Sequence, residues 1–164
     1  MEPSILYADQ MNPTLAVDKD GEDQLISSTD WTKVTSARVI WDLLGDYDSE
    51  NSQITVSQSG IYNYDMQMRF SDLSNVSIIE VALFKVTEAE PDYWFTLAFR
   101  NITVQNTVHL GAMTQFDFFE DEEYFLAVKL TPADEEVACS ATILGSDDFT
   151  AWGASWTAPN DRTA

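Results

Sequence analysis

The stretch SGIYNYDMQMRF, residues 59–70, decides the fold class. Tyr62, Tyr64, Met66, Met68 and Phe70 occupy every second position, and polar side chains stand between them. A period of two is that of a β-strand with one buried and one solvated face. The stretch therefore predicts a long strand, and it raises the question of what its apolar face packs against.

Strand signals of the same kind follow one another from Trp31 to Trp156. Residues 76–86 form an almost continuous apolar run, which is typical of a strand buried on both faces. Acidic or proline-containing turns separate the segments, and no apolar pattern of helical period extends over a helix length. The sequence predicts an all-β, antiparallel β-sandwich of about 8–10 strands.

The chain of 164 residues has the length of one domain. Residues 1–29 show no sustained period and are expected to form an irregular N-terminal arm. Residues 30–158 are expected to form the sandwich domain, and residues 159–164 a short polar tail. Because Cys139 is the only cysteine, an internal disulfide is excluded.

The charge balance is strongly acidic, with 28 acidic and eight basic residues and a formal net charge of −20. Such a surface disfavours nucleic acid as a partner, because phosphate binding depends on Lys and Arg. It favours a heavily hydrated protein of a high-salt environment, with a set of cation sites as the alternative. No apolar run is long enough to insert in a membrane, and the N-terminus lacks the pattern of an export signal.

Asp18, Asp20 and Asp23 surround Gly21 at a spacing that would let a tight turn aim several oxygens at one ion. They are therefore candidates for a calcium or other cation site, with a solvated acidic turn as the alternative. His109 is the only histidine and Cys139 the only cysteine of the chain, and both are expected to have structural roles. Because no catalytic or zinc motif occurs, we expect neither an enzyme nor a bound cofactor.

The order of motifs resembles the tumour necrosis factor and complement globular-head superfamily. The segments are VTSARVIWD (34–42), ITVSQSGIYNYDMQMRF (54–70), FEDEEYFLAVKL (119–130) and FTAWGASW (149–156). The Gly-Ile-Tyr of the second segment is the most specific of them. The third departs from the family, which usually has a Gly-Asp pair where this chain has Asp121, Glu122 and Glu123. The resemblance implies a ten-strand jelly roll that assembles as a compact homotrimer, with aromatic residues at its axis. Five residues are expected to build the core or that axis: Tyr62, Tyr64, Phe70, Phe125 and Trp152.

These features lead to the hypothesis of a trimeric structural protein on the surface of a virion, made in the host cytoplasm. It would be a capsid decoration, turret, spike-base or fibre-head module of a tailed virus with a halophilic host, in contact with the major capsid protein. The arm would clamp the particle or a neighbouring subunit. The alternative is a lectin-like module that binds host surface glycans through Trp31, Trp94 or Trp156.

Overall fold

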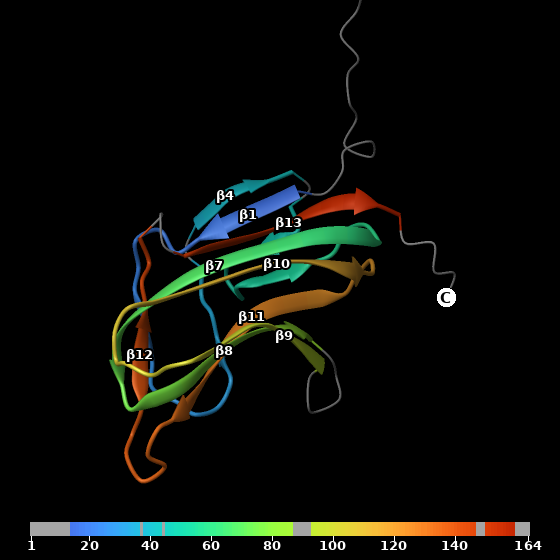
Figure 1. Ribbon diagram of the computed structural model, residues 1–164. Coiled ribbons are helices and arrows are strands. Elements are labelled where there is room, and N and C mark those ends of the chain that lie inside the picture. The colour runs from blue at the N-terminus through green and yellow to red at the C-terminus, as the bar shows by residue number, and fades with distance from the viewer. Residues whose placement is uncertain (1–13, 37, 44, 87–92, 147–149, 160–164) are drawn as a thin grey trace, which may run out of the picture.

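A computed structural model of the chain describes residues 14–36, 38–43, 45–86, 93–146 and 150–159, and every regular element in them is a β-strand (Figure 1). The all-β prediction is confirmed. No helix in these residues is long and apolar enough to cross a membrane. The described part has more strands than predicted because four of them contain only two or three residues. The strands are β1 (Thr14–Asp18), β2 (Gln24–Ile26), β3 (Thr32–Lys33), β4 (Arg38–Asp42), β5 (Tyr47–Asp48), β6 (Gln53–Thr55), β7 (Gly60–Ser74), β8 (Val76–Lys85), β9 (Tyr93–Asn101), β10 (Val108–Phe118), β11 (Glu123–Pro132), β12 (Ser140–Ile143) and β13 (Ala151–Ala158).

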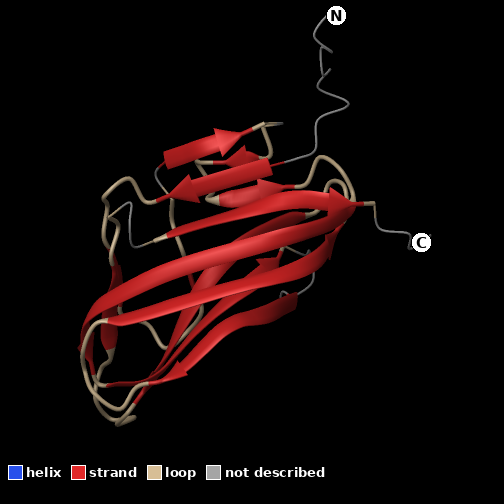
Figure 2. Ribbon diagram, turned by 45° about the horizontal axis from the view of Figure 1, so that its top comes forward, coloured by secondary structure: helices blue, strands red, loops and turns tan. Residues whose placement is uncertain are grey.

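The strands form two antiparallel sheets that pack as a sandwich (Figures 1 and 2). In the first sheet, β7 pairs with β10 along one edge, and β13 and β12 share the other edge. Strand β1 follows β13, β4 is the last strand on that side, and β2 pairs with β12. The second sheet has the order β5-β6-β11-β8-β9, with β3 also paired to β11. Strands β10 and β9 therefore lie next to each other at one edge of the sandwich.

The apolar face of β7 packs against the second sheet, which answers the question that the sequence raised. Its five alternating apolar side chains are at most 4% exposed and belong to the main hydrophobic core. Phe118 of β10 links the two layers, because its ring lies 5.1 Å from that of Tyr62 and 4.4 Å from that of Tyr124 of β11. The predicted alternation is confirmed along the whole stretch.

Gly60 opens β7 at a point where only a glycine fits. A Cβ atom there would overlap the indole of Trp156 in β13. That indole donates a hydrogen bond from Nε1 to the carbonyl oxygen of Ser59, at 3.3 Å. The glycine of the Gly-Ile-Tyr motif therefore allows β13 to close over the start of the long strand.

The prediction of an irregular arm is wrong at two places within residues 14–29. Residues 14–18 form β1, which is inserted in the first sheet between β13 and β4, and residues 24–26 form β2 beside β12. Leu15, Val17 and Ile26 are buried in the core. The segment looked irregular because its strands are short and separated by a polar turn, so no period accumulates. Residues 1–13 and 160–164 lie outside the described part of the chain.

Replacing Met68 by Ala tests the buried face of β7. Met68 is fully buried, so its truncation leaves a cavity and should lower the free energy of unfolding by about 2–4 kcal/mol. Gln67→Ala is the matched control on the exposed face of the same strand and should change that free energy by less than about 0.5 kcal/mol. The measurement is denaturant unfolding at constant salt. Equal losses in the two variants would contradict the orientation of β7.

Candidate functional site

The acidic turn between β1 and β2 is a tight turn whose carboxylates have partners inside the protein. Asp20 and Gly21 have positive φ angles of 50° and 80°, and the Glu22 amide donates to the Lys19 carbonyl oxygen at 3.0 Å. Two successive residues with positive φ define a turn of type I′, which explains the glycine. The Gly145 amide donates to Asp23 Oδ1 at 2.8 Å, and this contact ties the turn to the end of β12.

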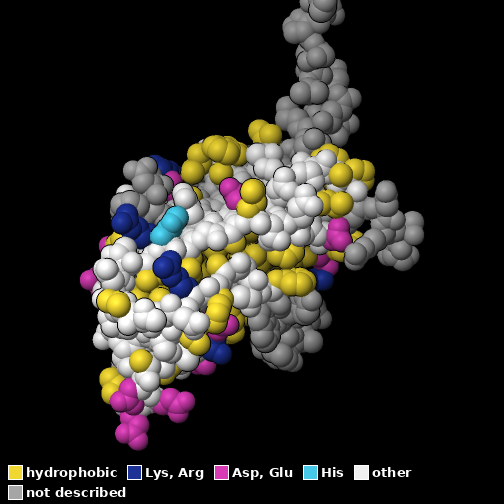
Figure 3. Space-filling model, in the orientation of Figure 1, with side chains coloured by type: hydrophobic (Ala, Val, Ile, Leu, Met, Phe, Trp, Pro, Cys, Tyr) yellow, Lys and Arg dark blue, Asp and Glu magenta, His cyan; other side chains and the backbone are white. Residues whose placement is uncertain are grey.

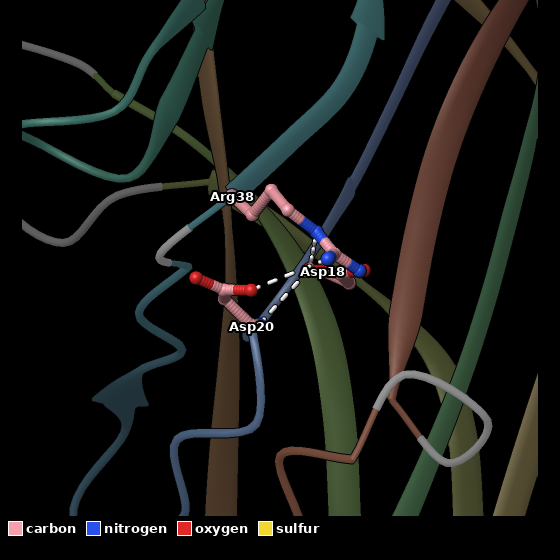
Figure 4. Close-up of polar contacts among 3 residues, drawn as sticks. All are labelled: Asp18, Asp20 and Arg38. Carbon is pink, nitrogen blue, oxygen red and sulfur yellow. Dashed lines mark hydrogen bonds and ion pairs between the residues drawn. The ribbon is translucent and has the colours of Figure 1, made fainter.

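An arginine supplies the positive charge beside two of the predicted cation ligands (Figure 4). Asp18 is 1% exposed and accepts hydrogen bonds from both Nε and Nη2 of Arg38. Arg38 Nη1 also lies 3.3 Å from Asp20 Oδ1. Asp23, the third candidate, faces Gly145 instead. No group of three metal-ligating side chains occurs among the described residues, and a metal-ion site at Asp18, Asp20 and Asp23 stays a prediction.

Lys19, the first residue of this turn, has a buried side chain. The side chain is 2% exposed, and its Nζ donates to the carbonyl and hydroxyl oxygens of Thr35 and to Gln24 Oε1, at 2.7–3.1 Å. Burial lowers the pKa of Lys19 to about 8, although the negative charges of Glu22 and Asp23 act in the opposite direction. The burial of Lys19 was not predicted, because the residue stands in a stretch of polar and acidic residues that is typical of a solvated turn.

The outer face of the first sheet carries a shallow hollow over small residues. Cross-strand pairing places Trp41, Ala16, Gly153, Asp65 and Met113 in one row across β4, β1, β13, β7 and β10. The hollow of about 410 Å³ lies over Ala16, Gly153 and Ser155, with Ile40 and Trp41 of β4 at one side. We call this surface the face hollow. Its floor permits close approach of another backbone, and its Trp41 is 52% exposed.

A second apolar surface lies at the opposite edge of the sandwich, where β9 meets β10. Phe95, Met113, Phe116 and Phe119 line two hollows there, of about 190 and 390 Å³. We call these four residues the edge surface. Met113 is 82% exposed and Phe95 47% exposed. In Figure 3 hydrophobic side chains gather across the middle of this view, whereas acidic ones are concentrated at its lower tip.

A neutralised ion pair borders the smaller hollow. Lys85 donates a hydrogen bond to one carboxylate oxygen of Glu122, and the Tyr124 hydroxyl donates to the other. Partial burial would raise the pKa of Glu122, but these two hydrogen bonds hold it below its ordinary value. Glu122 therefore stays ionised beside Lys85, and the pair adds no net charge to the edge surface.

The aromatic residues predicted for the core or the trimer axis lie in two places. Tyr62, Tyr64, Phe70 and Trp152 are at most 5% exposed and belong to the core between the sheets. Phe125 lies on the outer side of the second sheet, where it stacks on Phe84 at 5.3 Å within a smaller cluster. The exposed apolar residues of the face hollow and the edge surface were missed. For the face hollow, the sequence feature that could have indicated exposed apolar residues is the unbroken apolar triplet Val39-Ile40-Trp41, because a strand with one solvated face alternates apolar and polar residues.

The tryptophans predicted to stack on sugars do not form a shared platform in the described residues. Trp31 is half-buried and packs against Phe84, with their ring centroids 5.1 Å apart. Trp156 is also half-buried, and its indole donates a hydrogen bond to the Ser59 carbonyl oxygen. The side chain of Trp94 lies outside the described part. His109 is exposed on β10 and Cys139 is buried in the core. Glycan binding stays a prediction.

Comparison with solved structures identifies the fold. Murine APRIL superimposes with a TM-score of 0.64 at 13% identity, over 90% of this chain and 100% of that one. The globular domain of zebrafish complement 1qA protein gives 0.58 at 10% identity, over 92% and 100%. The Eiger TNF of S. frugiperda gives 0.58 at 14% identity, over 93% and 97%. No protein-family model and no curated protein matches the sequence. The predicted resemblance to the tumour necrosis factor and complement globular-head jelly roll is confirmed for the fold.

The buried lysine predicts an unusual alkaline pH dependence of stability. The pKa of Lys19 is about 8 in the folded chain and 10.5 when exposed, so between these values the unfolded chain binds more protons. The free energy of unfolding should therefore rise from pH 8 to pH 10, by about 1–2 kcal/mol. Above pH 10 it should fall, because burial raises the pKa of Tyr62, Tyr64 and Tyr124 and the unfolded tyrosines lose their protons first.

Denaturant unfolding between pH 8 and pH 10 measures the effect, with Lys19→Met as the control that removes the titrating group. The rise with pH should disappear in that variant. A rise of the same size in both proteins would show that another group causes it.

Proposed function

We propose that this chain is a non-enzymatic structural module that assembles as a homotrimer. The observation that carries the proposal is the presence of two unlike apolar surfaces, toward opposite edges of the first sheet, in a chain whose formal net charge is −20. The face hollow is recessed and floored by small residues, whereas the edge surface exposes Phe95 and Met113. Exposed apolar surfaces of this kind mark association sites.

The edge surface of one copy would pack on the face hollow of the next. Because the two surfaces differ, the contact is heterologous, and repeating it gives either a closed ring or an open fibre. Closure after three copies is what the resemblance in sequence and fold implies. The floor of Ala16, Gly153 and Ser155 would let the β9–β10 edge approach closely, and Trp41 would cover its side.

Electrostatic repulsion determines the conditions for assembly. Three copies carry a formal charge of 3 × −20 = −60. The screening length falls from about 10 Å at 0.1 M salt to about 3 Å at 1 M, so repulsion between copies is strong only in dilute salt. Apolar contacts are not weakened by salt in this way. The proposed trimer therefore suits a high-salt environment.

We place this trimer on the surface of a virion of a halophilic host, where the major capsid protein would be its neighbour. The acidic residues Asp134, Glu135 and Glu136 are exposed in the β11–β12 loop. In Figure 3 acidic side chains gather at the lower tip of the molecule. A hydrated acidic tip on a compact β-sandwich suits a decoration or spike-base module that is exposed to concentrated salt solution. Binding of a host glycan would be a further property of the displayed trimer.

Met113→Glu tests the assembly at the edge surface. A carboxylate at this exposed position should leave the fold intact but oppose burial against a second copy, so the variant should be a monomer in 1 M salt. The matched control is Val137→Glu, which adds the same charge at an exposed residue of the β11–β12 loop and should leave the trimer intact. Sedimentation velocity gives the masses. A monomeric unmodified protein in 1 M salt would overturn the proposal.

A mixture of two variants tests whether the contact is heterologous. Met113→Glu has a damaged edge surface and an intact face hollow, and Trp41→Glu has the reverse. Together they retain one intact contact, so the mixture should yield heterodimers and no trimer. Trimers in the mixture, or no association at all, would contradict the edge-on-face arrangement.

The location is tested by immunogold labelling of virus particles that carry this sequence, with an antibody against the purified protein. The expected result is regular labelling of the particle surface. Protein found only in the soluble fraction of infected cells, with unlabelled particles, would contradict a role in the virion but would not affect the trimer.

A further inference from the structure

The connection between β9 and β10 forms a polar hollow that is separate from the face hollow and the edge surface. Its volume is about 190 Å³, and residues 100–104 and 106–108 line it. This volume corresponds to about six water molecules, which is comparable to a single sugar ring. The polar members of the lining are Arg100, Asn101, Thr103, Asn106 and Thr107. The hollow is therefore suited to a small polar ligand.

Hydrogen bonds tie the loop around this hollow to the start of β8. The side-chain amide of Gln105 donates to the Val76 carbonyl oxygen at 2.8 Å and accepts from the Val76 amide at 3.1 Å. The Ile102 amide donates to the Ser77 carbonyl oxygen at 2.8 Å. A loop fixed in this way loses little conformational freedom when a ligand binds, so less of the interaction energy is spent on ordering it.

Arg100 supplies a positive charge to the hollow. Its Nη1 donates to the His109 carbonyl oxygen at 3.3 Å, which positions the guanidinium beside β10. The Arg100 side chain has no other partner among the described residues, so its remaining donors are available to a ligand. The lining, as far as the structure describes it, contains no acidic side chain. The hollow is therefore a local site for a carboxylate in an acidic chain, because arginine binds a carboxylate with two parallel hydrogen bonds.

The other polar side chains of the hollow match the hydroxyl groups of a sugar. Asn101, Thr103 and Thr107 are exposed, and each offers both a donor and an acceptor. Asn106 Oδ1 accepts from the Thr107 amide at 2.7 Å, which leaves the amide NH2 of Asn106 for a ligand. Val104, which is 68% exposed, adds an apolar contact for the C–H groups of a sugar ring. A simple anion would use the arginine and leave these groups without a role.

We propose that this hollow binds an acidic monosaccharide residue, a uronate. Arg100 contacts its carboxylate, and the asparagine and threonine side chains contact its hydroxyls. Within the proposed function, this is the contact between the displayed protein and a host glycan, and that biological role rests on the proposed display. The binding itself does not require the trimer, because one copy supplies every lining residue.

Titration of the isotope-labelled full chain with glucuronate and with galacturonate tests the site, in molar salt that screens the net charge. With at least one of them, the amide chemical shifts of residues 101–107 should change and saturate. The matching neutral sugar, glucose or galactose, should bind at least about tenfold more weakly, because it lacks the charge-assisted bond to Arg100. Acetate, which lacks the hydroxyls, should also bind at least about tenfold more weakly.

Two variants of Arg100 test the role of the arginine. Arg100→Gln should lower the affinity for the uronate to that for the neutral sugar and leave the affinity for the neutral sugar unchanged. Arg100→Lys keeps the charge without the planar fork and should lose part of the uronate affinity. The matched control is Lys129→Gln, which removes one positive charge from a half-buried position on β11 and should change neither affinity.

The proposal is overturned if neither uronate gives a saturable shift in residues 101–107. Equal affinity for the uronate and its neutral sugar, or for the uronate and acetate, would also overturn it. The same titration of Met113→Glu separates this result from the proposed trimer. Its affinity for the uronate should be unchanged, because Met113 does not line the hollow. A monomeric unmodified protein that binds the uronate would contradict the trimer alone.

Discussion

The pairing of β7 along both of its edges is the constraint on which the rest of the structure depends. With β10 on one side and β13 and β12 on the other, β7 cannot slip by one residue without moving five apolar side chains out of the core. The same register decides what the outer face presents. Asn63, Asp65 and Gln67 point outward from β7, beside Gly153 of β13 and Gln115 of β10. The middle of the outer face therefore consists of small and polar residues, and the apolar residues lie toward the two edges of the sheet.

Three of the eight basic residues of this acidic chain have partners that the structure describes. Arg38 neutralises the buried Asp18, Lys19 is held by backbone and hydroxyl oxygens, and Lys85 is paired with Glu122. Burial of a carboxylate such as Asp18 is tolerated only with a paired charge and hydrogen bonds, and Arg38 supplies both. The large negative charge therefore comes from the exposed acids, which are the ones that determine solubility and repulsion between copies.

The sequence predicted what repeats along a strand and missed what depends on contacts between distant segments. Alternation over residues 60–70 gave β7 and its core face, and the apolar run at 76–86 correctly indicated burial of Val81 to Phe84 on both sides of β8. Strand β1 was missed because five residues flanked by a turn show too little period. The partner of Asp18 was missed because Arg38 is 20 residues away in the sequence. The exposure of Trp41 follows from the position of β4 at the sheet edge, which only the topology shows.

The composition of the proposed interface and the acidity of the remaining surface would both suit a protein that works at high salt. Ion pairs across an interface would lose most of their attraction at molar salt, where charges are screened over about 3 Å. The row from Trp41 to Met113 contains one carboxylate, Asp65, and otherwise small or apolar residues. Beside it, Gln115 donates a hydrogen bond to Asn63 at 3.0 Å, a contact between neutral amides. In the proposed trimer, an interface of this composition would keep its affinity when salt rises, and screening of the surrounding acids would lower the repulsion between copies.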